Sequence, residues 1–150
     1  MTSKERVLKR ERERGRVDAQ QVQIRSAEMT GTELNAVCDC IPEFTESVKV
    51  KNMLERPVGF VCKSSEGRVV KLLQNYDSEI YKGEPEEYPA LFGFKWSNDP
   101  SHAKPFISLS TSPYMTGDCC KEDGAVFRSK VDNNVFSPSH YPEGWEEVEE

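Results

Sequence analysis

The sequence predicts a mainly β fold made of two small tandem antiparallel β-modules, preceded by an N-terminal α-helical arm. The clearest observation behind this prediction is a sequence pattern, the hairpin motif, that occurs twice, at residues 59–71 and again at residues 117–128. Each copy has a glycine, an apolar pair, a basic residue, a polar turn closed by glycine, a second apolar pair and a second basic residue. This pattern is typical of a β-hairpin, and its recurrence indicates a duplicated unit.

The likeness between the two copies continues beyond the hairpin. Tyr88-Pro89 is followed by Phe92, and Tyr141-Pro142 is followed by Trp145. Both copies therefore carry a Tyr-Pro turn that leads into a large aromatic residue, which extends the predicted repeat to a third segment.

The predicted arm covers residues 1–40. Residues 1–28 carry eight Lys/Arg and five Asp/Glu, so they contribute +3 and leave −9 of the net charge of −6 to the rest of the chain. The signs alternate along residues 9–14, which favours a solvated helix face over a nucleic-acid patch. The apolar stripe of residues 19–36 is thin, and we expect the domain behind it or a partner to order this helix.

The two modules are predicted at residues 41–96 and 104–150, where short strands alternate with turn residues. The expected strands of the two hairpins are residues 59–63, 68–74, 119–121 and 125–131. Residues 94–105 are predicted to be a polar linker, because Asp-Pro and Lys-Pro steps interrupt regular structure. Each module is too small for a sizeable core of its own, so we expect the two to pack together.

The composition excludes several classes of function. Charged residues make up 31% of the chain, and no apolar run approaches the roughly 20 residues that cross a bilayer, so no membrane insertion is expected. An acidic body disfavours binding to a phosphate backbone, so no nucleic acid is expected. The five cysteines lack the spacing of zinc sites, and neither a metal nor another cofactor is predicted. Cys62 and Cys120 fall at equivalent strand positions and are interpreted as reduced core residues, which fits assembly in a host cytoplasm.

The second copy resembles a known class of module. The segments Tyr114-Met115-Thr116-Gly117-Asp118, Gly124-Ala125-Val126-Phe127 and Trp145-Glu146 are similar to the conserved parts of small chitin-binding-type carbohydrate-binding modules. These modules occur in bacterial chitinases and in phage and prophage structural proteins of tail- or head-fibre-like type. The resemblance covers residues 105–148, and it covers residues 42–94 more weakly through the repeat.

Six residues of the second copy are expected to be structural. Glycines at turns adopt conformations that other residues avoid, an aspartate accepts turn N–H groups, and a small module depends on a few large aromatics for buried area. The residues in these roles are Tyr114, Gly117, Asp118, Gly124, Phe127 and Trp145.

The resemblance implies that exposed aromatic rings stack on the apolar face of a sugar. The chitinase modules carry tryptophans in the loop after the second strand, whereas this chain has Asp132-Asn133-Asn134-Val135-Phe136-Ser137 there. The double asparagine has a second interpretation as turn residues. The candidate glycan-binding residues are Phe136, Tyr141, Trp96, Asn133 and Asn134.

No catalytic arrangement is evident, and no enzymatic activity is expected: the two histidines, His102 and His140, lie in loop-like sequence without a nucleophile motif. The predicted function is that of a bacteriophage virion protein, present in many copies. Residues 1–40 would bind other virion proteins, and the modules would attach weakly to host-surface polysaccharide.

The alternative is a purely structural decoration or adaptor protein of a capsid or tail. Exposure of Trp96, Phe136 and Tyr141 distinguishes the two hypotheses, because buried rings cannot bind a sugar.

Overall fold

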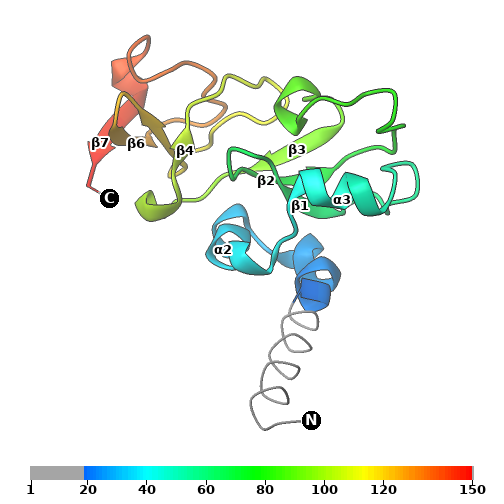
Figure 1. Cartoon of the computed structure of the whole chain (residues 1–150). Helices are drawn as coiled ribbons and strands as arrows, with labels where there is room; N and C mark the ends of the chain where they lie inside the picture. The colour runs from blue at the N-terminus through cyan, green and yellow to red at the C-terminus, as the bar shows by residue number, and fades with distance from the viewer. Residues whose placement is uncertain (1–18, 150) are drawn as a thin grey trace, which may run out of the picture.

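The computed structural model describes residues 19–149, which form two sheets side by side (Figure 1). The first sheet is antiparallel in the order β1-β2-β3, and the second has the order β4-β5-β6-β7, with β4 parallel to β5 and the other pairs antiparallel. The strands are β1 (Val61–Lys63), β2 (Val69–Leu72), β3 (Phe92–Lys95), β4 (Lys104–Pro105), β5 (Cys119–Glu122), β6 (Ala125–Ser129) and β7 (Trp145–Val148). The predicted mainly β fold class is confirmed, although the second sheet is mixed because of β4.

The helices are short and lie mostly before the first sheet. Residues 19–25 are helical. The others are η1 (Ser26–Glu28), α2 (Gly31–Ala36), η2 (Cys38–Cys40), α3 (Phe44–Val50), η3 (Pro85–Glu87), η4 (Pro100–His102) and η5 (Pro142–Gly144). Within residues 19–149, none has the length and apolar character needed to cross a membrane.

The repeat read from the sequence is also present in the backbone. Gly59 and Gly117 have φ values of 94° and 99°, and their N–H groups donate to Leu72 and Ser129 at 2.8 and 2.9 Å. The Tyr-Pro turns correspond too. In each one, the N–H of the residue three positions after the tyrosine donates to the tyrosine carbonyl. These bonds are Leu91 N to Tyr88 O at 2.9 Å and Gly144 N to Tyr141 O at 3.0 Å.

The two hairpins differ in their turns. In the second module, Asp123 and Gly124 form a two-residue turn in which both φ values are positive, at 53° and 81°. This combination matches the twist of the flanking strands and favours Asp-Gly. In the first module the turn is longer and is closed by Gly67 at φ 80°, whose N–H donates to Ser64 O at 2.8 Å.

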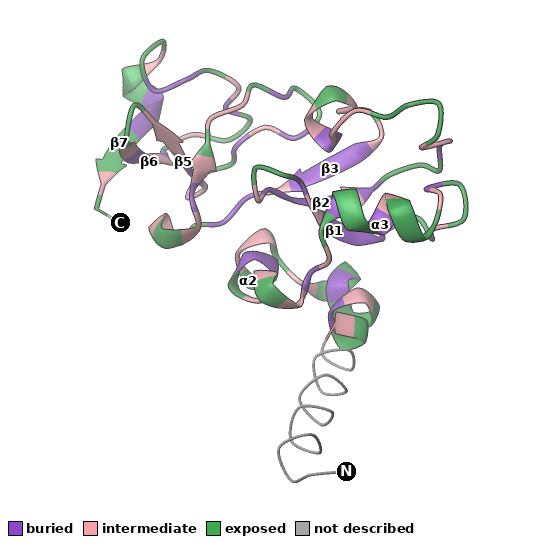
Figure 2. Cartoon of the chain, in the orientation of Figure 1, coloured by how far each residue is buried: buried purple, intermediate pink, exposed green. Residues whose placement is uncertain are grey.

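Both modules contribute to one hydrophobic core. Phe44, Phe92 and Phe94 of the first module belong to the same buried cluster as Cys120 and Trp145 of the second. In Figure 2 the buried purple ribbon extends from β1–β3 towards the second sheet. The modules therefore pack together, as expected for units too small to stand alone.

Trp96 lies at the centre of the contact between the modules, which corrects the prediction of a polar linker at residues 94–105. Its ring stacks on Tyr114 with centroids 4.4 Å apart, and its Nε1–H donates to Ser112 O at 2.9 Å. Only 8% of Trp96 is exposed. Residues 94–95 end β3, residues 104–105 form β4 and residues 100–102 form η4, so both ends of the predicted linker are built into the sheets. The segment is polar on average, but a few of its side chains, Trp96 above all, are buried in the core.

The described part of the predicted arm packs on the first sheet. Val22 and Leu34 join Val61 and Val69 in a second buried cluster. The Gln23 side chain accepts a hydrogen bond from Val61 N at 2.9 Å and donates to Val61 O at 2.7 Å. Its amide thus satisfies the free edge of β1 as another strand would. Residues 1–18 of the predicted arm lie outside the described residues.

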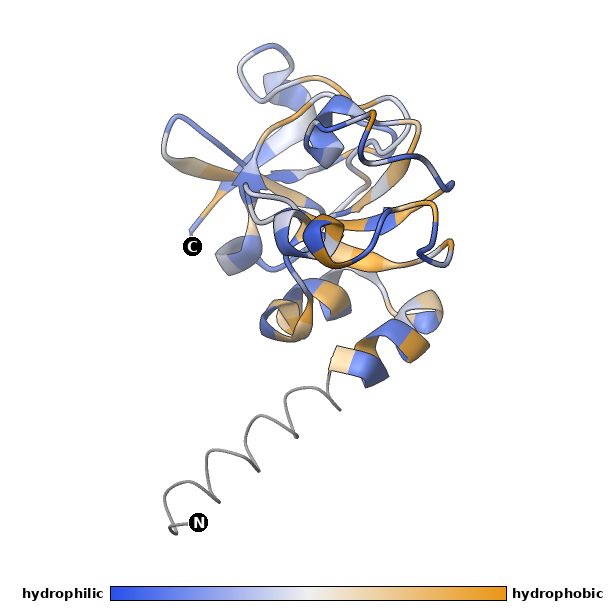
Figure 3. Cartoon of the chain, turned by 45° about the vertical axis from the view of Figure 1, so that its right-hand side comes forward, coloured by the Kyte–Doolittle hydropathy of each residue, from blue (hydrophilic) through white to orange (hydrophobic). Residues whose placement is uncertain are grey.

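The hydropathy of the ribbon agrees with this arrangement. In Figure 3, hydrophobic (orange) stretches run along strands and on the small helices, while several outer loops are hydrophilic (blue). The buried cluster that contains Val22, Leu34 and Val69 joins these helices to the first sheet.

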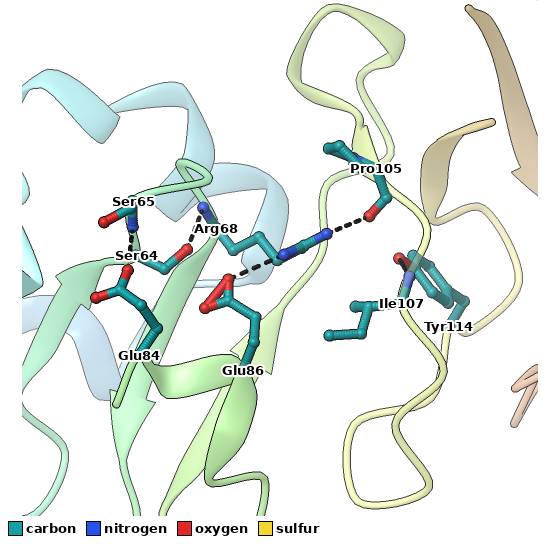
Figure 4. A network of polar contacts seen from close by, with 8 residues as sticks. All are labelled: Ser64, Ser65, Arg68, Glu84, Glu86, Pro105, Ile107 and Tyr114. Atoms are coloured by element: carbon teal, nitrogen blue, oxygen red, sulfur yellow. Dashed lines mark hydrogen bonds and ion pairs between the residues drawn. The ribbon is translucent and has the colours of Figure 1, made fainter. Parts of the chain in front are cut away.

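A buried arginine joins the two modules (Figure 4). Arg68 is 6% exposed, and its Nη1 lies 2.9 Å from Glu86 Oε2. Its Nη2 donates to Pro105 O at 2.7 Å, which places the bond across the boundary between the modules. The guanidinium therefore links the two modules by polar contacts beside the hydrophobic core.

Candidate functional site

An aromatic pair, the exposed Phe136 and the partly buried Tyr141, lies in the loop between β6 and β7. Phe136 is 59% exposed, and its ring contacts that of Tyr141 edge to face, with centroids 6.0 Å apart and an interplanar angle of 80°. A phenylalanine this exposed gains little free energy from its own burial, so its position on the surface invites a functional explanation.

The backbone beneath the pair is held by two buried side chains. Trp145 is 4% exposed, and its Nε1–H donates to Phe136 O at 2.8 Å. Asn134 is 2% exposed; its Oδ1 accepts from Phe136 N at 3.2 Å, and its Nδ2 donates to Ser129 Oγ at 3.1 Å and Gly144 O at 3.3 Å. Phe136 is therefore anchored through both its N–H and its carbonyl.

Tyr141 owes its position to a neighbouring glycine. A Cβ atom placed on Gly144 would overlap the Tyr141 ring. The Tyr141 N–H donates to Ser137 O at 2.8 Å, which closes the turn before η5. The absence of a side chain at residue 144 thus allows the ring to lie against the backbone and reach Phe136.

A depression of about 460 Å³ opens beside the aromatic pair. Its volume falls in the range of small-molecule sites. It is lined by Val131, Asp132, Asn133, Asn134, Phe136, His140 and Tyr141.

The polar groups of this depression are fixed by local contacts. Asp132 Oδ1 accepts a hydrogen bond from Thr116 N at 3.0 Å, and bonds from the Thr116 backbone and side chain lower the pKa of Asp132, so it is charged at neutral pH. His140 Nδ1 lies 2.7 Å from Ser137 Oγ. A negative charge and an imidazole therefore border the two rings.

Four of the five predicted glycan-binding residues meet at this depression: Phe136, Tyr141, Asn133 and Asn134. Asn133 is exposed and has φ 55°, as a turn asparagine does. Two assignments need correction. Asn134 is buried and hydrogen-bonded within the loop, so its amide supports the site from beneath, and Trp96 lies in the core, where its ring faces Tyr114 and no sugar can reach it.

The residues predicted to be structural lie in the core or in turns. Tyr114 and Trp145 are 1% and 4% exposed, and Phe127 is partly buried against the core. Gly117 and Gly124 have positive φ, and Asp118 Oδ2 accepts from Met115 N at 2.8 Å in the turn before β5.

Asp132, His140 and Gly144 were not among the predicted glycan-binding residues. For Gly144 a signal existed in the repeat itself, because the matching position in the first module is Leu91 and the change from leucine to glycine is large. Asp132 and His140 carried no such signal, since charged and polar loop residues are common.

The buried thiols do not form a reactive centre. Burial raises the pKa of both Cys62 and Cys120 to about 12, which keeps them protonated at neutral pH. Within residues 19–149 there is no group of three or more His, Cys, Asp or Glu side chains placed to hold a metal ion.

No protein-family model, curated protein or solved structure matches this chain. The resemblance of residues 105–148 to chitin-binding-type modules therefore remains a prediction from the residues.

Proposed function

We propose that this chain is a phage virion structural or accessory protein whose second module attaches weakly to glycans of the host surface. The observation that carries the glycan part is the exposed Phe136 ring, paired with Tyr141 and held from beneath by Trp145 and Asn134.

An anchored aromatic pair suits a sugar for physical reasons. The C–H groups of a pyranose face pack on an aromatic ring, and nearby polar groups satisfy the hydroxyls at its rim. Because hydrogen bonds hold the backbone of Phe136 at both its N–H and its carbonyl, little backbone entropy is lost when a ligand binds. A site with two rings is weak alone, and display in many copies raises avidity by roughly 10²–10⁴.

The virion part of the proposal is supported by the resemblance and by the sequence of the N-terminal segment. Residues 19–40 pack on the first sheet, so binding to other virion proteins is assigned to residues 1–18. This segment carries seven Lys/Arg against four Asp/Glu, in alternation, which is suited to ion pairs with a partner protein.

A second candidate function, a structural decoration or adaptor protein without glycan binding, has its own support. Val50 is the last residue of α3, and Leu54 and Val58 lie between α3 and β1; they are 81%, 54% and 61% exposed. Exposed apolar side chains close together in the chain are characteristic of protein–protein contacts.

The glycan proposal is tested with a multimerised form of the full chain on an array of bacterial surface glycans. Binding to a subset of glycans is expected, with loss in Phe136→Ala and in Tyr141→Ala. Tyr81→Ala is the matched control, because this ring is 52% exposed in the first module. Absence of binding by the wild-type multimer, or equal loss in the control, would favour the adaptor function.

The virion proposal is tested by deleting residues 1–18 and following incorporation into particles. Incorporation is expected to fail while the purified variant keeps the wild-type unfolding midpoint. Removal of all of residues 1–40 is unsuitable, because it would expose Val61 and Val69. Normal incorporation of the shorter variant would contradict the anchoring role.

A further inference from the structure

We propose that the glycan site extends across Phe136 into a second depression and accepts an uncharged linear oligosaccharide of two or more sugars, while it rejects polyanionic glycans. This inference rests on the proposed glycan binding and specifies the chemistry of the ligand.

The second depression adjoins the first at Phe136 and has a volume of about 450 Å³. Phe136 and His140 line both depressions, so these two side chains lie where the depressions meet. Away from this junction, Ser108, Glu122 and Ser139 line the second depression. A ligand that contacts both depressions therefore passes Phe136, which places an apolar ring in the middle of the groove and polar groups towards both ends.

Each depression contains one carboxylate. Asp132 borders the first, and its pKa is lowered by hydrogen bonds from Thr116. Glu122 borders the second, where its Oε1 accepts from Ser139 N at 3.0 Å. The residues that line the two depressions, all within the described range, include no lysine or arginine.

This charge pattern selects the class of glycan. A carboxylate accepts hydrogen bonds from sugar hydroxyls, and it repels a carboxylate, sulfate or phosphate placed beside it. The net charge of −6 for the chain adds to this repulsion at longer range. A neutral sugar meets one acceptor at each end of the groove and suffers no such penalty.

The test measures binding of the multimerised full chain to two sets of probes. The first set is neutral: cello-, malto-, manno- and N-acetylchito-oligosaccharides of one to six sugars. The second set is acidic: oligogalacturonates and hyaluronan oligosaccharides of matched lengths. We expect binding by at least one neutral series, an increase in affinity of about tenfold or more from one sugar to three, and binding to the acidic series at least tenfold weaker.

Isosteric variants test whether the two carboxylates cause the preference for neutral over acidic probes. Glu122→Gln keeps the acceptor for Ser139 N, and Asp132→Asn keeps the acceptor for Thr116 N. The double variant is expected to narrow the difference between neutral and acidic probes severalfold. Glu143→Gln is the control, since it removes the same charge from η5 outside both depressions and should leave the difference unchanged.

The outcomes separate this inference from the function on which it rests. Binding of acidic probes as tight as that of neutral ones, or a monosaccharide as tight as a trisaccharide, would overturn the inference and leave glycan binding intact. An unchanged preference in the double variant would likewise overturn the role of Glu122 and Asp132. Failure of every probe to bind would overturn the inference together with the proposed glycan attachment.

Discussion

The two modules share one backbone plan but give the matching tyrosine different partners. Tyr88 packs on Tyr76 and Tyr81, with both ring centroids 6.0 Å away, and its hydroxyl accepts from Gly83 N at 2.9 Å. Tyr141, at the matching position, contacts the exposed Phe136. The first tyrosine packs in a cluster of tyrosines from its own module, and the second, which is also partly buried, packs against a phenylalanine that is 59% exposed.

A single position explains much of this difference. Residue 91 is leucine in the first module, and the matching residue 144 is glycine in the second. A Cβ at residue 144 would overlap the Tyr141 ring, so the orientation of Tyr141 is open only to the module with glycine. The repeated hairpin motif therefore specifies the scaffold that both modules share, whereas the loop before the third strand determines where the tyrosine ring of each module lies.

The third strands carry a second difference. Phe92 and Trp145 occupy matching positions and are both buried, at 0% and 4% exposure. Only the indole has an N–H, and it donates to Phe136 O. Trp145 therefore fills the core as Phe92 does and also supports the site.

The largest expected effect comes from removing these two aromatics. Phe92→Ala and Trp145→Ala should each lower the free energy of unfolding by about 3–5 kcal/mol, because each leaves a cavity in the shared core. Urea unfolding followed by circular dichroism and by tryptophan fluorescence should show one cooperative transition in both variants.

Trp145→Phe sharpens this comparison, since it retains most of the buried ring and removes the donor to Phe136 O. The expected cost is about 1 kcal/mol, with a larger fall in glycan binding than in stability. Separate transitions for the two modules in any of these variants would contradict the shared core.

The next effect concerns the polar contacts of Arg68 that link the modules. Arg68→Met should lower the free energy of unfolding by about 3–5 kcal/mol, because it leaves the largely buried carboxylate of Glu86 (14% exposed) without its partner. The double variant Arg68→Met/Glu86→Leu should recover part of this loss. If the single variant unfolds at the wild-type urea midpoint, Arg68 does not join the modules in the manner described.

An alkaline titration compares the two modules through their matching thiols. The folded-state pKa of Cys62 and of Cys120 is raised to about 12 from 9.0. The stabilisation from keeping each thiol protonated is therefore full below pH 9 and is lost between about pH 9 and 12, at about 1.4 kcal/mol per pH unit per thiol.

Alkylation by iodoacetamide at pH 8.5, read by mass spectrometry, should spare both thiols in the native protein and label both in urea. Native labelling of one thiol but not the other would show that the modules are not equally closed.

The smallest effect on stability is expected at the glycine that distinguishes the modules. Gly144→Ala should displace the Tyr141 ring, reduce glycan binding at least severalfold and change the free energy of unfolding by less than about 1 kcal/mol. Glu143→Ala, in the same turn, serves as the control for changes in η5. If Gly144→Ala binds glycan as tightly as the wild type, Gly144 does not position Tyr141 for binding.

The sequence predicted the parts of the fold that local backbone chemistry decides. The turn glycines, the hairpin strands and the Tyr-Pro turns lie where the repeat placed them, because each depends on neighbours a few residues away. The loop that carries Phe136 and Tyr141 was also found, since its position follows from the strands that flank it.

What the sequence did not predict depends on distant contacts. Trp96 is buried by Tyr114, and Gln23 pairs with the edge of β1 at Val61, far along the chain in each case. Asn134 reads as an exposed turn residue until its bonds to Ser129 and Gly144 are known. Polar composition therefore misplaced residues whose burial is set by partners that no local pattern specifies.

The central claim, that the surface above Trp145 binds sugar, is tested most directly by the indole N–H resonances in a ¹H–¹⁵N correlation spectrum. The chain has two tryptophans, and only Trp145 donates its N–H to the loop of Phe136. Titration with the neutral oligosaccharide that binds best should shift the Trp145 indole signal and leave that of Trp96 in place. A bound sugar that shifts only the Trp96 signal, or neither signal at saturation, would contradict the account.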